Sequence, residues 1–181
     1  MIRRRAMLAG LGGLAAFSAF VPGLVESDVI KIDLASDMSG ARVGFEPTGV
    51  FVVPGQSVRW INRANVHTVT AYHPDNARHS LRIPKQAKPW DSGYLVEPGA
   101  VFELRLEVPG VYDYYCAPHE EAGMAGRIVV GEISGPGSLP FDYFENLPEA
   151  GTWRRVPDAV RKRLPDADSI VGHHFASSQS F

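Results

Sequence analysis

The segment Val111–Val130 constrains the chain more than any other, because it holds three metal-binding side chains at a fixed spacing. Cys116, His119 and Met124 form a Cys-x2-His-x4-Met arrangement. A thiolate, an imidazole and a thioether all suit copper. The residues on both sides have the alternation or the β-branched composition that is typical of strands. We therefore expect the three side chains on a short loop between two strands, which leaves them little freedom to relax.

A second histidine must complete such a site. A blue-copper centre uses two imidazoles and one thiolate near a plane, with a weak axial thioether. His67 is the best candidate, because it stands at the start of the β-branched run Thr68–Thr70. A strand of one sheet could deliver it to a loop of the other sheet. The predicted metal ligands are therefore His67, Cys116, His119 and Met124.

The segment Pro109–Gly126 resembles the ligand loop of the cupredoxins, and in particular of plastocyanin and pseudoazurin. Val53–Asn62 is similar to the strand that leads to the family's first histidine ligand. The resemblance covers roughly residues 28–131. It implies an all-β fold, a two-sheet antiparallel Greek-key sandwich, with one type 1 copper ion that cycles between Cu(I) and Cu(II).

One position departs from the family. An asparagine usually follows the first histidine ligand, where it ties the two ligand segments together and supports the cysteine sulfur. This chain has Thr68 at that position. We expect Thr68 to make the connection less well, with consequences for copper affinity and reduction potential.

The ligand-bearing region has the pattern of strands and turns. Ser57–Asn62 and Val101–Val108 alternate apolar and polar residues, as expected for strands with one buried face. Residues 71–100 form a long, proline-containing loop insertion, which predicts loops and short turns. His73 and His79 in this insertion are expected to be solvated rather than ligands. The cationic side chains of the insertion form either a solvated surface or a docking patch: Arg78, Arg82, Lys85 and Lys88.

Residues 1–23 have the pattern of an export signal. Arg3–Arg5 precede a run of apolar and small residues, which is typical of secretion signals. Arg4–Leu8 also resembles the twin-arginine signal, which exports folded proteins. An ordinary Sec signal and an uncleaved membrane anchor are the alternatives, although glycines and Pro22 make a poor spanning helix. We expect a mature protein that is periplasmic or otherwise extracytoplasmic and does not span the membrane.

Residues 132–181 lie outside the resemblance and are predicted to form an irregular C-terminal extension. Several prolines alternate there with aromatic residues. Pro157–Leu164 has the pattern of one short helix, with its proline in the first turn. The extension is expected to pack over the sandwich domain of residues 28–131, and a partner-binding arm is the alternative. His173 and His174 are expected to be exposed rather than metal-binding.

Composition and local sequence argue against several functions. The chain has 181 residues, a formal net charge of −2 and one cysteine. This charge balance gives no support for nucleic-acid binding. A single cysteine excludes an intramolecular disulfide and a two-cysteine binuclear copper site. Nitrite reductases and multicopper oxidases place histidines beside the cysteine of their blue site, whereas Tyr115 and Ala117 are the neighbours here. We therefore do not expect an enzyme.

The predicted function is single-electron transfer between redox partners outside the cytoplasm. A copper-binding or delivery protein without electron transfer is the alternative. Redox proteins such as c-type cytochromes, or a copper enzyme, would dock transiently near His119, whose ring edge should reach the surface. Glu120 and Glu121 would steer such partners by charge. The expected docking ring around His119 is apolar and consists of Ala117, Pro118, Ala122, Gly123 and Met124.

Overall fold

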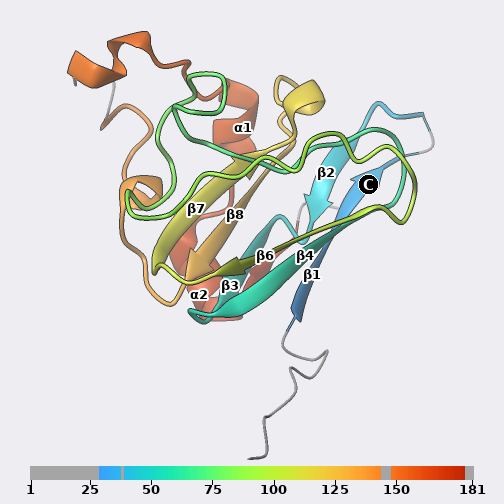
Figure 1. Ribbon diagram of the computed structural model, residues 1–181, viewed down its shortest axis with the longest axis horizontal. Coiled ribbons are helices and arrows are strands. Elements are labelled where there is room, and N and C mark those ends of the chain that lie inside the picture. Colours follow the sequence, from blue (N-terminus) through green and yellow to red (C-terminus); the bar gives the residue numbers. More distant parts are fainter. Residues whose placement is uncertain (1–28, 38, 144–147, 178–181) are drawn as a thin grey trace, which may run out of the picture.

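The chain forms two β-sheets packed together, as Figure 1 shows. The computed structural model describes residues 29–37, 39–143 and 148–177, so the predicted export signal lies outside the described residues. Within these ranges, no helix has the length and apolar character that crossing a membrane requires. The first sheet consists, in spatial order, of β2 (Val43–Glu46), β1 (Val29–Ser36), β4 (Gln56–Asn62) and β6 (Val101–Leu106). The second consists of β5 (Thr70–Ala71), β7 (Gly110–Tyr115), β8 (Ala125–Val130), β3 (Gly49–Val52) and β9 (Phe175–Ala176).

Alternation places one face of the first sheet in the core. In β4, Val58, Trp60 and Asn62 are buried, whereas their neighbours are partly exposed. The reason is that successive side chains of a strand point to opposite faces of the sheet. Trp60 is fully buried and meets Tyr114 of β7 edge-to-face, with 5.4 Å between ring centroids. This contact joins the two sheets across the core.

The central strands of the second sheet are buried on both faces. Every residue of β7 and β8 is buried, so a further layer must cover the face that points away from the core. The C-terminal extension supplies this layer. Ile170 packs with Val111 and Val129, and Val160 packs with Tyr115. The extension is therefore part of the folded core.

The predicted two-sheet sandwich is confirmed, but its sheets are mixed rather than antiparallel. β1 pairs in parallel with β4, and β3 pairs in parallel with β8. The other pairs of named strands are antiparallel. Between β1 and β4 the chain passes through β2 in the first sheet and β3 in the second. This crossing between sheets returns β4 beside β1 in the same direction, which a simple hairpin would not do.

The C-terminal extension is more regular than predicted. It contains the 3-10 helices η3 (Pro136–Ser138) and η5 (Pro148–Thr152), the α-helices α1 (Asp158–Arg163) and α2 (Ala167–His173), and β9. The helix expected at residues 157–164 is confirmed as α1, with Pro157 at its N-cap. The short helix α2 was not predicted, although Asp166 carries a capping signal: its side chain accepts a hydrogen bond from the Ser169 N–H. His173 and His174 are exposed, as expected.

Two buried arginines join the extension to the sandwich. Asp113 of β7 is fully buried and accepts hydrogen bonds from Nε of Arg82 at 3.0 Å and from Nε of Arg127 at 2.7 Å. Their remaining guanidinium groups donate to carbonyl oxygens of the extension, at Pro136, Gly137, Leu139 and Pro165. Such partners replace the water that a buried guanidinium loses. Arg82 is therefore not part of a solvated or docking surface, and the prediction is wrong for this residue, whereas Arg78, Lys85 and Lys88 are exposed.

Candidate metal centre

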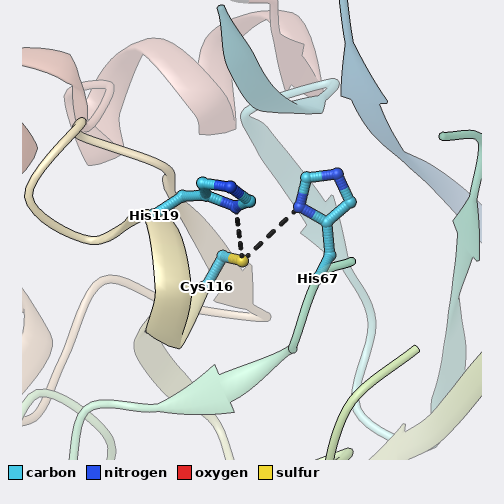
Figure 2. Close-up of side chains that lie close together, drawn as sticks. All are labelled: His67, Cys116 and His119. Atoms are coloured by element: carbon cyan, nitrogen blue, oxygen red, sulfur yellow. Dashed lines mark hydrogen bonds between the residues drawn. The ribbon is translucent and has the colours of Figure 1, made fainter. Parts of the chain in front are cut away.

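Three of the four predicted ligands converge on one point (Figure 2). Cys116 directly follows β7, and His119 is the last residue of the 3-10 helix η2 (Ala117–His119). His67 lies between β4 and β5, where its backbone exchanges two hydrogen bonds with Leu95. Two segments that are distant in sequence are thus each fixed by backbone pairing, and they bring their side chains together.

The ligating atoms are close enough to share one ion. Cys116 Sγ lies 3.5 Å from His67 Nδ1 and 3.4 Å from His119 Nδ1, and the three atoms all lie within 4.8 Å of one another. Metal bonds to nitrogen and sulfur of about 2.0–2.3 Å place the ligand atoms of a trigonal plane roughly 3.5–4 Å apart. The side chains present therefore fit a single copper ion held by two imidazoles and a thiolate.

Met124 closes the ligand loop. The N–H of Cys116 donates to the carbonyl of Met124 at 3.0 Å, and the N–H of Met124 donates to the carbonyl of His119 at 3.1 Å. The Met124 side chain is fully buried and belongs to the same core cluster as Cys116. The predicted axial residue thus lies in the same compact turn as the other two loop ligands.

Burial sets the protonation states of the site. Burial raises the pKa of the Cys116 thiol to about 11. Burial, together with the nearby His119 imidazole, lowers the pKa of His67 to about 4, and burial also lowers the pKa of His119. Both imidazoles are therefore neutral near pH 7 and ready to bind a metal, whereas the thiol must release its proton as the ion binds.

Thr68 ties the two ligand segments together. Its N–H donates to Cys116 Sγ at 3.3 Å, and its Oγ1 accepts a hydrogen bond from the Ala117 N–H at 2.8 Å. Thr68 therefore makes the connection that the family resemblance assigns to asparagine, and a weaker connection than asparagine would make stays a prediction. The threonine hydroxyl reaches the backbone of the cysteine loop, because β5 starts close beside the end of β7, with Thr70 paired to Tyr115.

Two polar residues that were expected in solvent lie inside the protein. Glu120 is 4% exposed and His79 is 1% exposed, and Glu120 Oε2 lies 3.0 Å from His79 Nε2. Glu120 Oε1 accepts a hydrogen bond from the Tyr72 hydroxyl at 2.8 Å, and Tyr115 Oη lies 3.1 Å from His79 Nδ1. Glu120 thus fixes the ligand loop from inside rather than steering partners. These partners are 36 to 48 positions apart, so no local sequence pattern reveals them.

The predicted docking ring around His119 is only partly exposed. His119 itself is half-buried, and its exposed apolar neighbours are Ala117, Pro118 and Ala122. Gly123 and Met124 are buried instead. Helix α1 covers Gly123 so closely that an added Cβ would lie 3.0 Å from the Ala159 carbonyl oxygen. The surface beside the site is therefore smaller than the sequence suggested.

Comparison with known proteins agrees with this set of donors. Residues 32–131, which hold all four predicted ligands, match the family described as "Copper binding proteins, plastocyanin/azurin family". The chain belongs to this family. It is therefore a copper-binding protein. The description of the family names copper binding and no enzyme activity, in agreement with the neighbours of Cys116.

Plastocyanins and pseudoazurins are among the family members that this chain resembles. It is 28% identical over 126 residues to a chloroplastic plastocyanin of Oryza sativa subsp. indica, covering 70% of this chain and 80% of that protein. It is 32% identical over 101 residues to a plastocyanin of Scenedesmus fuscus, covering 56% of this chain and 98% of that protein. The pseudoazurin structure from Methylobacterium extorquens AM1 superposes with a TM-score of 0.52 at 21% identity, covering 80% of this chain and 98% of that one. The last likeness shows that the fold is the cupredoxin sandwich.

Proposed function

We propose that this protein carries single electrons outside the cytoplasm through a type 1 copper ion bound by His67, Cys116, His119 and Met124. The observation that carries the proposal is the approach of two imidazole Nδ1 atoms to Cys116 Sγ, at 3.4 and 3.5 Å. A set of two nitrogens, a thiolate and a thioether is a compromise between the ligands that Cu(I) and Cu(II) each prefer. Bound copper would supply the one-electron couple.

The protein around the ligands is built to hold them still. Cys116 and Met124 are joined by a backbone hydrogen bond that continues the β7–β8 ladder, and Thr68 donates its N–H to the sulfur. His67 is held through its backbone and by Ser36, whose Oγ lies 3.1 Å from Nε2. A site that hardly moves between oxidation states needs little reorganisation when an electron arrives or leaves.

His119 is the proposed port for electrons. It is the more exposed of the two imidazoles, and exposed apolar residues surround it. A small apolar contact of this kind suits a partner that binds briefly and leaves quickly. Glu121 is exposed beside it and would add charge steering. We propose c-type cytochromes or a copper enzyme as partners.

Substitution of the thiolate tests the copper site. The copper-loaded protein should have an intense visible sulfur-to-copper charge-transfer band, and Cys116→Ala should abolish it, because the chain has no other cysteine. Copper-EPR and absorption spectra of both proteins are the measurement, with Glu121→Gln as a control that should keep the band. A variant Cys116→Ala that stays blue would refute the ligand assignment.

Copper delivery is the competing function, and the burial of the site argues against it. His67 and Met124 are fully buried, whereas a delivery protein needs an open site that releases its ion. Stopped-flow mixing with a c-type cytochrome, set beside the rate of copper transfer to a chelator, separates the two. Electron exchange should be much faster than copper loss. Rapid copper loss without electron exchange would favour delivery.

We also propose export through the twin-arginine route, from Arg4 and Arg5. Twin-arginine recognition depends on the arginine pair, whereas a Sec signal needs only positive charge. Replacing both residues with lysine should therefore leave the precursor in the cytoplasm, as cell fractionation would show. Normal export of the lysine variant would rule out this route while leaving the copper assignment untouched.

A further inference from the structure

A chain of hydrogen bonds runs from the cysteine loop to a carboxylate in the loop insertion. The Ala117 N–H donates to Thr68 Oγ1 at 2.8 Å. Thr68 Oγ1 lies 3.0 Å from Thr70 Oγ1. The Thr70 hydroxyl donates to Asp91 Oδ1 at 3.1 Å. None of these four residues is a candidate ligand, and Thr70 and Asp91 have no part in the function proposed so far.

The donor and acceptor groups at its two ends fix the direction of this series of hydrogen bonds, which we call the relay. A backbone N–H can only donate, so Thr68 Oγ1 accepts from Ala117 and has its own proton free for Thr70. Thr70 Oγ1 accepts that proton and passes its own hydroxyl hydrogen to Asp91, because an ionised carboxylate only accepts. Hydrogen bonds that point the same way polarise and strengthen one another in a low-dielectric interior.

Burial makes the two hydroxyls dependent on each other. Thr68 is 3% exposed and Thr70 is 2% exposed, so neither can exchange a lost partner for bulk water without cost. Asp91 is an exposed residue, but it is held in place, since Oδ1 also accepts a hydrogen bond from the Gly93 N–H at 2.9 Å. One end of this series of hydrogen bonds, Asp91, is therefore fixed to the loop insertion, and the other end, the Ala117 N–H, belongs to the cysteine loop.

We propose that Thr70 and Asp91 are positioning residues of the copper centre, which act through Thr68 to hold its N–H on Cys116 Sγ and thereby raise the reduction potential. This inference rests on the proposed copper ligation by Cys116. Hydrogen bonding around the cysteine sulfur tunes the potential of a blue-copper site. A hydrogen bond to the thiolate lowers its donation to Cu(II), so a Thr68 N–H that moves away from the sulfur should favour Cu(II) and lower the potential.

Thr70→Val tests the relay, because valine keeps the shape of threonine and removes the hydroxyl. The ratio of Cu(I) to Cu(II) affinity should fall on the order of tenfold, which corresponds to a potential about 59 mV lower for a one-electron couple. Redox titration of the copper-loaded variant measures this change. Thr70→Ser restores the hydroxyl and should return the potential to near its original value. A potential that is unchanged in Thr70→Val, or equally lowered in Thr70→Ser, would overturn the proposal.

Thr48 supplies a matched control. It is also a buried threonine, 6% exposed, and its Oγ1 donates to the carbonyl of Phe45 at 3.1 Å. Thr48→Val should lower stability without moving the potential. If Thr48→Val shifts the potential as much as Thr70→Val does, the effect is general loosening and the relay has no special role.

Amide hydrogen exchange of the copper-free protein provides a readout that does not depend on the metal. Thr70→Val should speed exchange of the Ala117 and Thr68 amides by on the order of tenfold relative to amides of β8, and unchanged exchange at both would contradict the relay. Asp91→Ala, at an exposed position, should shift both readouts in the same direction by a smaller factor. No shift with Asp91→Ala would remove Asp91 from the relay. If Cys116 is not a ligand, the blue colour is missing from the outset, whereas the exchange experiment still decides whether the relay exists.

Discussion

The two sides of the ligand loop have opposite environments. Glu120 and Glu121 are neighbours, yet Glu120 is 4% exposed and Glu121 faces solvent. The solvent side also presents Ala117, Pro118 and Ala122. The covered side packs beneath α1, at Gly123. One loop of a few residues thus has a solvent-exposed side and a side that is part of the protein core, where the loop insertion contacts Glu120 and the C-terminal extension contacts Gly123.

The largest expected effect separates the two glutamates. Glu120→Ala leaves the Tyr72 hydroxyl and His79 without their shared buried partner, which should cost about 3 kcal/mol of unfolding free energy. Glu121→Ala should change stability by no more than about 0.5 kcal/mol, as is usual for exposed positions. Urea unfolding of the copper-free proteins measures both. Equal losses would show that the two sides do not differ as described.

A pair of glycines tests the contact with α1 itself. Gly123 has φ +84°, and an added Cβ would lie 3.0 Å from the Ala159 carbonyl oxygen. Gly99 has a similar φ of +88° but open space around it. Gly99→Ala should cost about 1 kcal/mol from backbone strain alone, whereas Gly123→Ala should cost about 2 kcal/mol because it must also displace α1. An equal loss of unfolding free energy in Gly123→Ala and Gly99→Ala would argue against close packing of α1 on Gly123.

The comparison of the two sides can also be made through the pH dependence of stability, because the two imidazoles differ in burial. The pKa of His67 is lowered to about 4 by burial and by His119, whereas the unfolded chain binds the same proton near pH 6.5. The free energy of unfolding of the copper-free protein is therefore highest above about pH 7. It decreases as the pH falls from 6.5 towards 4, because the unfolded chain binds a proton at His67 that the folded protein does not. The loss should be about 1 kcal/mol at pH 5.5. Chemical denaturation at both pH values measures it.

Variants of the two histidines show which imidazole causes this pH dependence. His67→Gln should remove more of the slope than His119→Gln, because His67 is fully buried and His119 is only half-buried. A slope that persists in His67→Gln would place the titrating group elsewhere.

The smallest effect on stability belongs to the solvent side. Ala122→Asp places a charge on the exposed rim near His119, and should leave the unfolding free energy within about 0.5 kcal/mol of the original. It should nevertheless slow electron exchange with a redox partner severalfold, because the apolar contact would be interrupted. Stopped-flow rates and unfolding curves of the same variant test both halves of this statement. A rate as fast as that of the unchanged protein would move the port away from Ala122.

Much of the site was predictable because its information is local. The spacing of Cys116, His119 and Met124 fits one short loop, and the β-branched residues after His67 marked a strand near the second imidazole. The alternation in Gln56–Asn62 likewise matches a strand with one buried face. In each case, the physical cause acts over a few neighbouring residues.

Several of the errors concern ionisable residues whose partners are far away in sequence. Arg82 and Asp113 are 31 positions apart, and His79 and Glu120 are 41 positions apart. Ionisable side chains are normally exposed, so the expectation of solvent was reasonable for each residue alone. It failed for Arg82 because the C-terminal extension covers β7 and provides carbonyl partners, and for His79 and Glu120 because each is the buried partner of the other. No local pattern carries that information.

The contact between Gly123 and α1 also fixes an order of events during the protein's synthesis. The chain grows from its N-terminus, so all four candidate ligands are synthesised before residues 158–163 of α1. Until then, Tyr115 lacks the cover that Val160 provides. The ligand loop can therefore reach the packing seen in the structure only after α1 has been synthesised and has left the ribosome.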